Sequence, residues 1–408
     1  MRQGNAVAGN TGKPRPLRAD PDEFRPDPHA GYARCRPLTP LIEFGDGLPY
    51  AIRHADVMAL MTDPRTRQME TEGLLLRGIG SGALYDFFAN TMLLSNPPVH
   101  ARRRRPAARA FAYRLIDRWR PRIRALVGEM LDGIAAAGEA EFLTAIAAPL
   151  PARLTARILG APREDAPGFA SLVYRMSRGL GSFRPEEFPA IEEAAAELTR
   201  YVRGLLEARR ESPREDFLTD YLARVEEAGT LSEAETLMQI VSLIIAGSDT
   251  TRFGLTALFS NLLADRAQWQ TVCNDPALAP AAVEEALRFE PPVGSIVRVL
   301  VDPLEIGGIA LPEGTVLNLS MISAQRDSAV FSEPDRFDIR RDDHPRANIS
   351  FGDGPHRCLG EMLARAEMEE ALRAIASRFP QMRLAGPPMR PRGHTGIRGA
   401  GALPVAWG

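Results

Sequence analysis

The ten residues Phe351-Gly352-Asp353-Gly354-Pro355-His356-Arg357-Cys358-Leu359-Gly360 decide more about this chain than any other stretch of it. Gly352 and Gly354 permit positive φ, so a tight loop can form and its backbone can approach a flat partner closely. Cys358 then stands at the start of a helix predicted from Cys358 to about Phe379. Free N–H groups and the helix dipole at that end favour a thiolate over a thiol. A thiolate held in this way is a good axial ligand for iron, because it donates electron density that favours O–O cleavage.

Two other interpretations of Cys358 have to be weighed. A buried, inert structural cysteine at a turn is the usual state of an isolated cysteine. A structural zinc site is the second alternative, but such sites need four ligands. No Cys or His pair at zinc spacing accompanies Cys358, and the other two cysteines, Cys35 and Cys273, are distant in the sequence.

The complete ten-residue pattern resembles the haem-binding loop of the cytochromes P450, and is closest to soluble bacterial members. The resemblance covers the chain from about Pro49 onward. It implies the P450 fold, which is mainly α with a minor β part, and haem b as cofactor. It makes Cys358 the ligand to iron and places Phe351, Gly352, His356 and Gly360 around the haem.

Glu285 and Arg288 form a Glu-x-x-Arg pair, which places a carboxylate and a guanidinium on one helix face. Without the resemblance, the pair would be a surface ion pair worth less than about 1 kcal/mol. In the P450 family this pair is buried and is joined by an arginine from a later irregular segment. The resemblance assigns that structural role to Arg336 in Pro334-Asp335-Arg336-Phe337.

The clearest predicted helix runs from Ser232 to about Leu263. Ser232 and Glu235 form a capping box at its start, and its middle is apolar on all sides, as in a buried helix. The resemblance makes Ala246-Gly247-Ser248-Asp249-Thr250 an oxygen-activating kink, with Thr250 as hydrogen-bond donor to bound dioxygen and Asp249 as proton relay. The alternative is a threonine hydroxyl that bonds back to a helix carbonyl.

Basic residues in three places resemble the family's partners of the haem propionates. His100 and Arg104 lie four apart in a His-x-x-x-Arg pattern, Arg298 follows the Glu-x-x-Arg helix, and His356 lies in the cysteine loop. Pro106 falls inside the helix that carries the first two and should bend it.

The run Arg102 to Arg105 invites a nucleic-acid interpretation, but a net charge of −2 and the absence of aromatic platforms disfavour it. By resemblance, its outward members steer an acidic [2Fe-2S] ferredoxin, which a ferredoxin reductase supplies with electrons. Gly78-Ile79-Gly80-Ser81-Gly82-Ala83 partly fits a dinucleotide loop but lacks the βαβ context. We therefore expect no bound flavin or NAD(P)H.

The rest of the 408-residue chain suggests one haem domain at 29–408, preceded by a flexible tail at 1–28. We expect helices at about 98–290 and 358–380, and small sheets at about 30–60, 295–320 and 383–406. A short strand followed by a helix is predicted within Pro49 to Thr62, and Gly73 to Pro98 reads as a long irregular connection. Three scattered cysteines fit a reducing compartment, and no apolar run is long enough to cross a bilayer. We expect a cytoplasmic monomer without membrane anchors.

The function implied is a haem-thiolate monooxygenase that hydroxylates or O-demethylates a small-to-medium apolar substrate, aromatic or terpenoid. Arg77 could meet a substrate carboxylate or could be an ordinary exposed loop residue. The residues expected to line the substrate pocket are Phe87, Leu243, Ala246, Val293 and Ile296. Two rivals remain: a P450-like haem protein that binds or recruits without oxygenating, and a peroxide-driven enzyme. Asp249 and Thr250 speak against both, because neither rival needs a proton relay for dioxygen.

Overall fold

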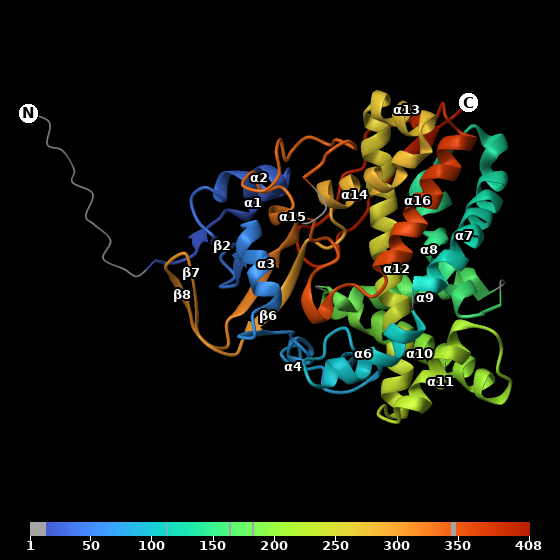
Figure 1. Ribbon diagram of the computed structural model, residues 1–408. Helices are drawn as coiled ribbons and strands as arrows, with labels where there is room; N and C mark the ends of the chain where they lie inside the picture. The colour runs from blue at the N-terminus through green and yellow to red at the C-terminus, as the bar shows by residue number, and fades with distance from the viewer. Residues whose placement is uncertain (1–13, 112, 163–164, 182, 344–347) are drawn as a thin grey trace, which may run out of the picture.

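The computed structural model describes residues 14–408 except 112, 163–164, 182 and 344–347. Figure 1 shows the strands of the main sheet together with α1, α2, α3 and α15 on one side of the molecule. The long helices gather on the other side. The predicted fold class, mainly α with a minor β part, is confirmed.

The helices vary from single turns to more than thirty residues. Their bounds are α1 (Pro21–Phe24), α2 (Pro28–Cys35), α3 (His54–Thr62), α4 (Glu72–Leu75), α5 (Ala83–Asn90), α6 (Val99–Ala110), α7 (Tyr113–Ile134), α8 (Pro149–Ile158), α9 (Ala166–Ser177), α10 (Phe188–Glu211), α11 (Phe217–Ala228), α12 (Glu233–Ala264), α13 (Arg266–Asn274), α14 (Ala279–Phe289), α15 (Met321–Ala324) and α16 (Glu361–Arg378). Among the helices described, none combines the length and the apolar character that a membrane span requires.

The strands form one mixed sheet and two small antiparallel ones. The main sheet has the order β1 (Leu17–Arg18), β2 (Leu41–Glu43), β3 (Pro49–Ala51), β9 (Val316–Ser320), β6 (Ser295–Leu300) and β4 (Thr66–Arg67). The second sheet has the order β10 (Arg383–Leu384), β11 (Pro404–Ala406) and β5 (Glu139–Glu141), and the third pairs β7 (Leu304–Ile306) with β8 (Ile309–Leu311). The long strands β6 and β9 pair antiparallel from Ser295 to Val299, and Val293, just before β6, forms a bridge with Ile397.

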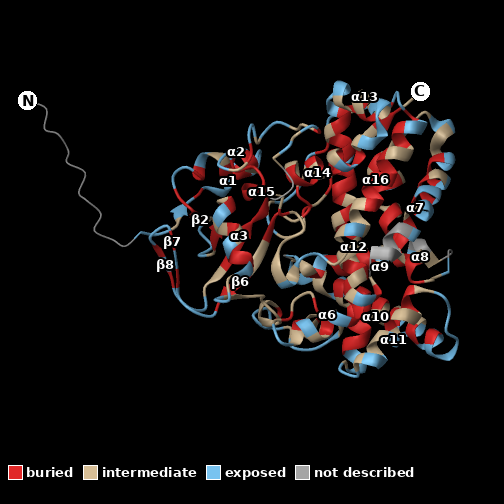
Figure 2. Ribbon diagram, viewed as in Figure 1, coloured by how far each residue is buried: buried red, intermediate tan, exposed pale blue. Residues whose placement is uncertain are grey.

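Helix α12 is the central element of the helical part. The Ser232 hydroxyl accepts the N–H of Glu235, and the Glu235 carboxylate accepts the N–H of Ser232, so the predicted capping box is present. Most of the helix is buried between α14, α16 and the helices α8 to α10 (Figure 2). Gly254 permits the close approach of α16, because a Cβ there would lie 3.2 Å from the side chain of Met368.

Several predicted boundaries were wrong. The 73–98 connection contains α4 and α5, whose buried residues Leu74, Leu84 and Phe87 pack into the core and so stabilise short helices that local pattern does not reveal. The predicted 1–28 tail contains β1 and α1, since β1 pairs with β2 and Asp20 caps α1. The strand β5 interrupts the helical region, because its partner β11 lies near the C-terminus.

Candidate functional site

A stripe of accessible residues runs along the otherwise buried helix α12. Leu243, Ala246, Gly247 and Thr250 are half-buried, while most of their neighbours in the helix are buried. Positions three, four and seven residues apart share one face of a helix. This face is therefore the part of the central stretch of α12 that keeps accessible surface.

The segment before β6 and β6 itself contribute half-buried Val293 and Ile296. This is compatible with the predicted pocket positions. Phe87 is different, because its side chain has no exposed surface and packs in the core among the helices. The neighbouring Phe88 is half-buried and lines a cavity, so the helical turn of α5 directs the second phenylalanine, and not the first, toward open space.

The loop before α16 turns sharply around two glycines. Gly352 and Gly354 have φ of +68° and +65°, as predicted from their residue type. A Cβ on Gly354 would also lie 2.7 Å from the Thr62 side chain. The N–H of Cys358 donates to the carbonyl of Phe351 at 2.8 Å, which closes the loop and fixes the direction of the cysteine.

Cys358 lies three residues before α16, because that helix begins at Glu361 and not at Cys358 as predicted. The surrounding protein raises the pKa of the Cys358 thiol, while the N–H of Gly360 and the charges of Arg104 and Arg357 lower it. The residue nevertheless keeps accessible surface, so the thiol is open to a ligand. The expected preference for a thiolate therefore does not come from the protein alone; a bound metal cation would provide it.

Four basic side chains gather beside this loop without an acidic partner. The rings of His100 and His356 lie 4.0 Å apart, and Arg104 donates to the carbonyl of Arg357 at 2.6 Å. Burial, followed by His100, Arg298 and Arg104, lowers the pKa of His356 to about 3. Burial lowers the pKa of Arg298 to about 10. Burial, followed by the charge of Arg104, lowers the pKa of His100 to about 4.

In the described part of the chain, no carboxylate forms an ion pair with any of these four side chains, and Nε2 of His100 is buried without a hydrogen-bond partner. Buried cations are normally paired. The cluster is therefore suited to a ligand that brings acidic groups of its own.

Asp249 is buried on α12 and forms an ion pair with Arg252, one turn further along the helix. The Arg252 guanidinium lies 4.3 Å above the ring of Tyr174 from α9. Burial raises the pKa of the Asp249 carboxyl, while Arg252 and a hydrogen bond with Ser177 lower it. Asp249 is thus a buried acid paired with Arg252, on the same helix as the accessible stripe.

Thr250 donates its hydroxyl to the carbonyl of Ala246 at 2.9 Å, which is the plain alternative that the sequence left open. Ser248 and Thr251 make the same type of bond to Ile244 and Gly247. The helix is continuous through these residues, and of the three only Thr250 is half-buried.

Glu285 and Arg288 are completely buried and joined by two hydrogen bonds of 2.8 and 2.9 Å. The side chain of Arg341 completes the network, since its Nε lies 3.4 Å from Glu285. Arg336 does not do so; its side chain is 62% exposed and pairs with Glu333, and only its carbonyl accepts from Arg288. The prediction for Arg336 was wrong because two arginines in the same irregular segment are chemically equivalent until the chain is folded.

The run Arg102 to Arg105 mostly faces the protein. Arg102 and Arg103 both bind Glu235, and Arg104 points to the cysteine loop. Arg105 is exposed and is the member of the run with no partner among the described residues. Pro106 lies inside α6, which continues through it to Ala110. Elsewhere, Arg77 is exposed and lies 4.4 Å above the ring of Phe183, where it donates to that residue's carbonyl.

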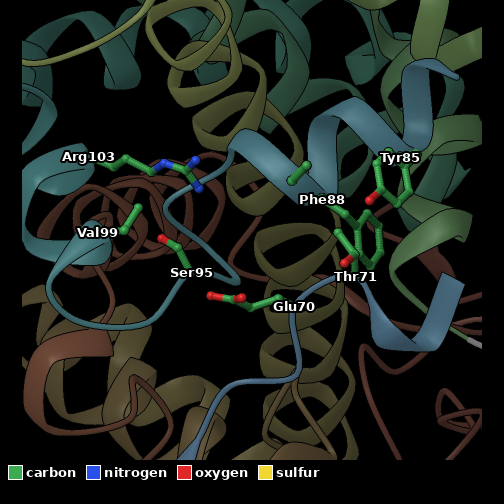
Figure 3. A pocket seen from close by; sticks show the side chains of 8 residues that line it. Glu70, Thr71, Tyr85, Phe88, Ser95, Val99 and Arg103 are labelled. Carbon is green, nitrogen blue, oxygen red and sulfur yellow. The ribbon is translucent and has the colours of Figure 1, made fainter. Parts of the chain in front are cut away.

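A separate cavity of about 250 Å³ lies between α5, α6 and the segment before α4 (Figure 3). It is lined by Glu70, Thr71, Tyr85, Phe88, Ala89, Ser95, Val99 and Arg103. Neither Cys358 nor any residue of the α12 stripe lines it.

Comparison with known proteins agrees with this geometry. The family model for "Cytochrome P450" matches residues 172–393. The chain is 42% identical over 373 residues to the plant-inducible cytochrome P450-pinF1 of Rhizobium radiobacter, a match that covers 91% of this chain and 88% of that protein. It belongs to the cytochrome P450 family.

Further relatives and solved structures support the assignment of this cytochrome P450. The nocardicin C N-oxygenase of Nocardia uniformis subsp. tsuyamanensis is 33% identical over 93% of this chain and 96% of that protein. The crystal structure of CalO2 superposes with a TM-score of 0.89 at 29% identity, covering 96% of this chain and 99% of that chain. The enzyme class is thus cytochrome P450 monooxygenase, and the family implies haem.

The residues of this P450 fit a haem. Cys358 offers a thiolate ligand, the glycine loop offers a close-fitting backbone, and the four basic side chains could hold two propionates.

Three residues near the site were not predicted: Arg252, Glu367 and Arg341. The spacing of Arg252 from Asp249 could have indicated the first. Glu367 is buried on α16 with an unpartnered Oε1, and burial raises its pKa to about 8; nothing in its sequence context indicates this.

Proposed function

We propose that this cytochrome P450 hydroxylates or O-demethylates a small-to-medium apolar substrate, aromatic or terpenoid, with dioxygen and two electrons supplied by another protein. The observation that carries the proposal is the buried acid Asp249 directly before the accessible hydroxyl of Thr250 on the α12 stripe. A non-oxygenating haem protein or a peroxide-driven enzyme has no use for this pair.

Haem b bound through Cys358 would supply the oxygen-activating chemistry. His100, Arg104, Arg298 and His356 would hold its propionates, and the backbone of Phe351 to Gly360 would lie against its proximal face. Gly352 would allow the loop to approach closely, and Gly360 would direct its N–H to the sulfur. Arg288, Glu285 and Arg341 would hold the segment beneath this loop.

The protein's own contribution to catalysis would be proton handling and exclusion of water. Thr250 would accept a hydrogen bond or donate one at the oxygen-binding position, because its hydroxyl can exchange the bond to Ala246 for another partner. Asp249 would carry protons from outside to that hydroxyl by turning away from Arg252. General acid–base steps of this kind typically contribute about 10²–10⁴ in rate.

Leu243, Ala246, Val293 and Ile296 would form an apolar wall for the substrate. Their side chains are all aliphatic, so they would select by shape and apolar character. Arg77 is held against the ring of Phe183.

The electron donor would be a [2Fe-2S] ferredoxin with its reductase. Arg105 is the residue of the arginine run that has no partner among the described residues and could meet an acidic protein. Arg109 lies one turn beyond it, is also exposed, and pairs with Glu227 at 3.5 Å. A monomeric protein in the cytoplasm, without bound flavin or nicotinamide, completes the proposal.

The first test is a titration of the purified ferric protein with aromatic acids and with neutral terpenoids. A high-spin shift of the Soret band by one panel would identify the substrate class. Absence of a Soret band in protein made with ample haem would overturn the haem-thiolate assignment.

The second test compares Thr250→Ala with Thr251→Ala under turnover with the ferredoxin system. Both changes remove one hydroxyl and one bond to a helix carbonyl, but Thr251 is buried. We expect Thr250→Ala to keep consuming NADH while product per NADH falls about tenfold or more, and Thr251→Ala to stay coupled. Equal coupling in both variants, or full activity with peroxide alone, would favour the rivals.

A further inference from the structure

The cavity between α5 and α6 contains one acidic group that the fold does not neutralise. Oε1 of Glu70 accepts from the N–H and the side-chain amide of Asn96, at 3.1 and 3.0 Å. Its Oε2 has no hydrogen bond and no ion pair in the part of the chain that the structure describes. Figure 3 shows the Glu70 carboxylate on the floor of the cavity, with Ser95 and Arg103 beyond it.

The positive side chain in the same cavity is already engaged. Nε of Arg103 donates to Glu235 at 2.9 Å, and its NH1 donates to the carbonyl of Thr91 at 3.2 Å. Arg102 binds the same carboxylate, that of Glu235, but does not line the cavity. Arg103 is therefore fixed by its neighbours, whereas Glu70 still has a free oxygen.

Aromatic surface stands opposite this carboxylate. Tyr85 and Phe88 on α5 line the far wall, and Thr71 and Ser95 add hydroxyl groups (Figure 3). An aromatic face attracts a cation placed over it, and a nearby carboxylate attracts the same charge. The volume of about 250 Å³ corresponds to the liquid volume of roughly eight waters, enough for a single-ring amine.

We propose that this cavity is a second small-molecule site, which binds an organic cation such as a protonated or quaternary arylalkylamine. Glu70 pairs with the charge, and Tyr85 and Phe88 pack against the ammonium and the ring. Val99 and Ala89 provide the apolar remainder of the wall.

A hydrogen-bond chain connects this site to the basic cluster. Asn96 binds Glu70 and also accepts the N–H of Gln68 at 2.7 Å, and the side chain of Gln68 accepts from Arg298 at 3.1 Å. A cation that moves the Glu70 carboxylate therefore also shifts the partners of Arg298. An effect of the cation on the haem through this chain rests on the proposed role of Arg298; binding itself does not.

The test uses para-fluorophenylethyl trimethylammonium as the probe and para-fluorophenylethanol as its neutral counterpart, both followed by fluorine NMR with the haem-containing protein. The quaternary nitrogen has no lone pair, so the probe cannot ligate iron. Because NMR detects binding without turnover, a failure of the oxygenation reaction leaves this result unaffected.

The variants are Glu70→Gln, Phe88→Leu and the control Asp86→Asn. Glutamine keeps an oxygen for the Asn96 bonds and removes the charge. Asp86 is exposed on the same helix as Phe88 and does not line the cavity. Asp86→Asn therefore measures how far removal of any nearby negative charge weakens binding of the cationic probe. Retention of the Soret band checks that each variant is folded.

We expect the probe to bind the wild type at least tenfold more tightly than the alcohol, and Glu70→Gln to weaken the probe by about tenfold. Phe88→Leu should weaken it as well, and Asp86→Asn should change it by no more than about twofold. Equal binding of probe and alcohol, or an unchanged affinity in both Glu70→Gln and Phe88→Leu, would overturn the proposal.

Discussion

Asp249 and Arg252 form an ion pair across one turn of α12, and the aromatic ring of Tyr174 lies 4.3 Å beneath the guanidinium. The pair is largely shielded from water, with the two side chains 11% and 26% exposed. A buried acid held in this way keeps a charge next to Thr250 in the sequence without leaving that charge unpaired. Proton movement through Asp249 would thus require the carboxylate to leave Arg252 and return to it.

Asp249→Asn should slow product formation by about two orders of magnitude, because the amide cannot carry a proton. The rate should also acquire a larger solvent deuterium isotope effect, since proton delivery becomes limiting. The comparison is with Ser248→Ala, which removes a buried hydroxyl on the preceding residue. Turnover of Asp249→Asn within twofold of the wild type would remove the acid from the proposed relay.

Arg341→Ala should destabilise the protein by about 3 kcal/mol, because it leaves part of the buried Glu285 carboxylate without its partner. Arg336→Ala, in the same segment, should change the free energy of unfolding by less than about 0.5 kcal/mol, since its side chain is exposed. Urea denaturation followed by circular dichroism measures both. A larger loss in Arg336→Ala would show that the two arginines have been assigned the wrong way round.

Glu367 should make the protein less stable as pH rises. Burial raises its folded pKa to about 8, above the ordinary value of 4.5, so the folded state binds the proton more tightly than the unfolded state does. Its contribution is complete below pH 4.5 and is lost as pH rises toward 8. Glu367→Gln should therefore gain stability relative to the wild type between pH 5.5 and pH 8.5, by about 3 kcal/mol. Denaturation curves at the two pH values give the difference; parallel changes in both proteins would place the titration elsewhere.

If Arg298 holds a propionate as proposed, Arg298→Gln should release haem at least about tenfold faster than the wild type, because a charge-assisted bond would be lost from a buried position. Arg105→Gln removes the same charge at an exposed site and should not change haem release. Transfer of haem to excess apomyoglobin measures the rate. Identical rates in the two variants would mean that Arg298 does not hold the cofactor.

Much of the fold was predictable because the signals are local. The capping box at Ser232 and Glu235 acts between residues three apart, and the glycines of the 351–360 loop specify positive φ by their own residue type. The same is true of Glu285 and Arg288, whose spacing alone places them on one face of α14.

Predictions that depended on contacts between distant segments were less successful. Phe87 and Phe88 are adjacent and identical, and the packing of α5 against α10 and α12 decides which of them faces a cavity. The strands β1 and β5 form only because their partners lie beside them in the folded chain. Short strands of two or three residues carry too little pattern to be recognised alone.

The sequence by itself therefore determined the family, the position of Cys358 and the polar pair Asp249 and Thr250, because each is written in contiguous residues. Only the tertiary structure decided that Arg341 and not Arg336 meets Glu285 and that Arg252 binds Asp249. It also decided that one oxygen of Glu70, in a cavity, has no partner among the described residues. The physical reason is that burial and pairing of a charge depend on which segments pack around it. The burial of a charged residue is therefore determined by segments throughout the chain and not by the residues next to it in the sequence.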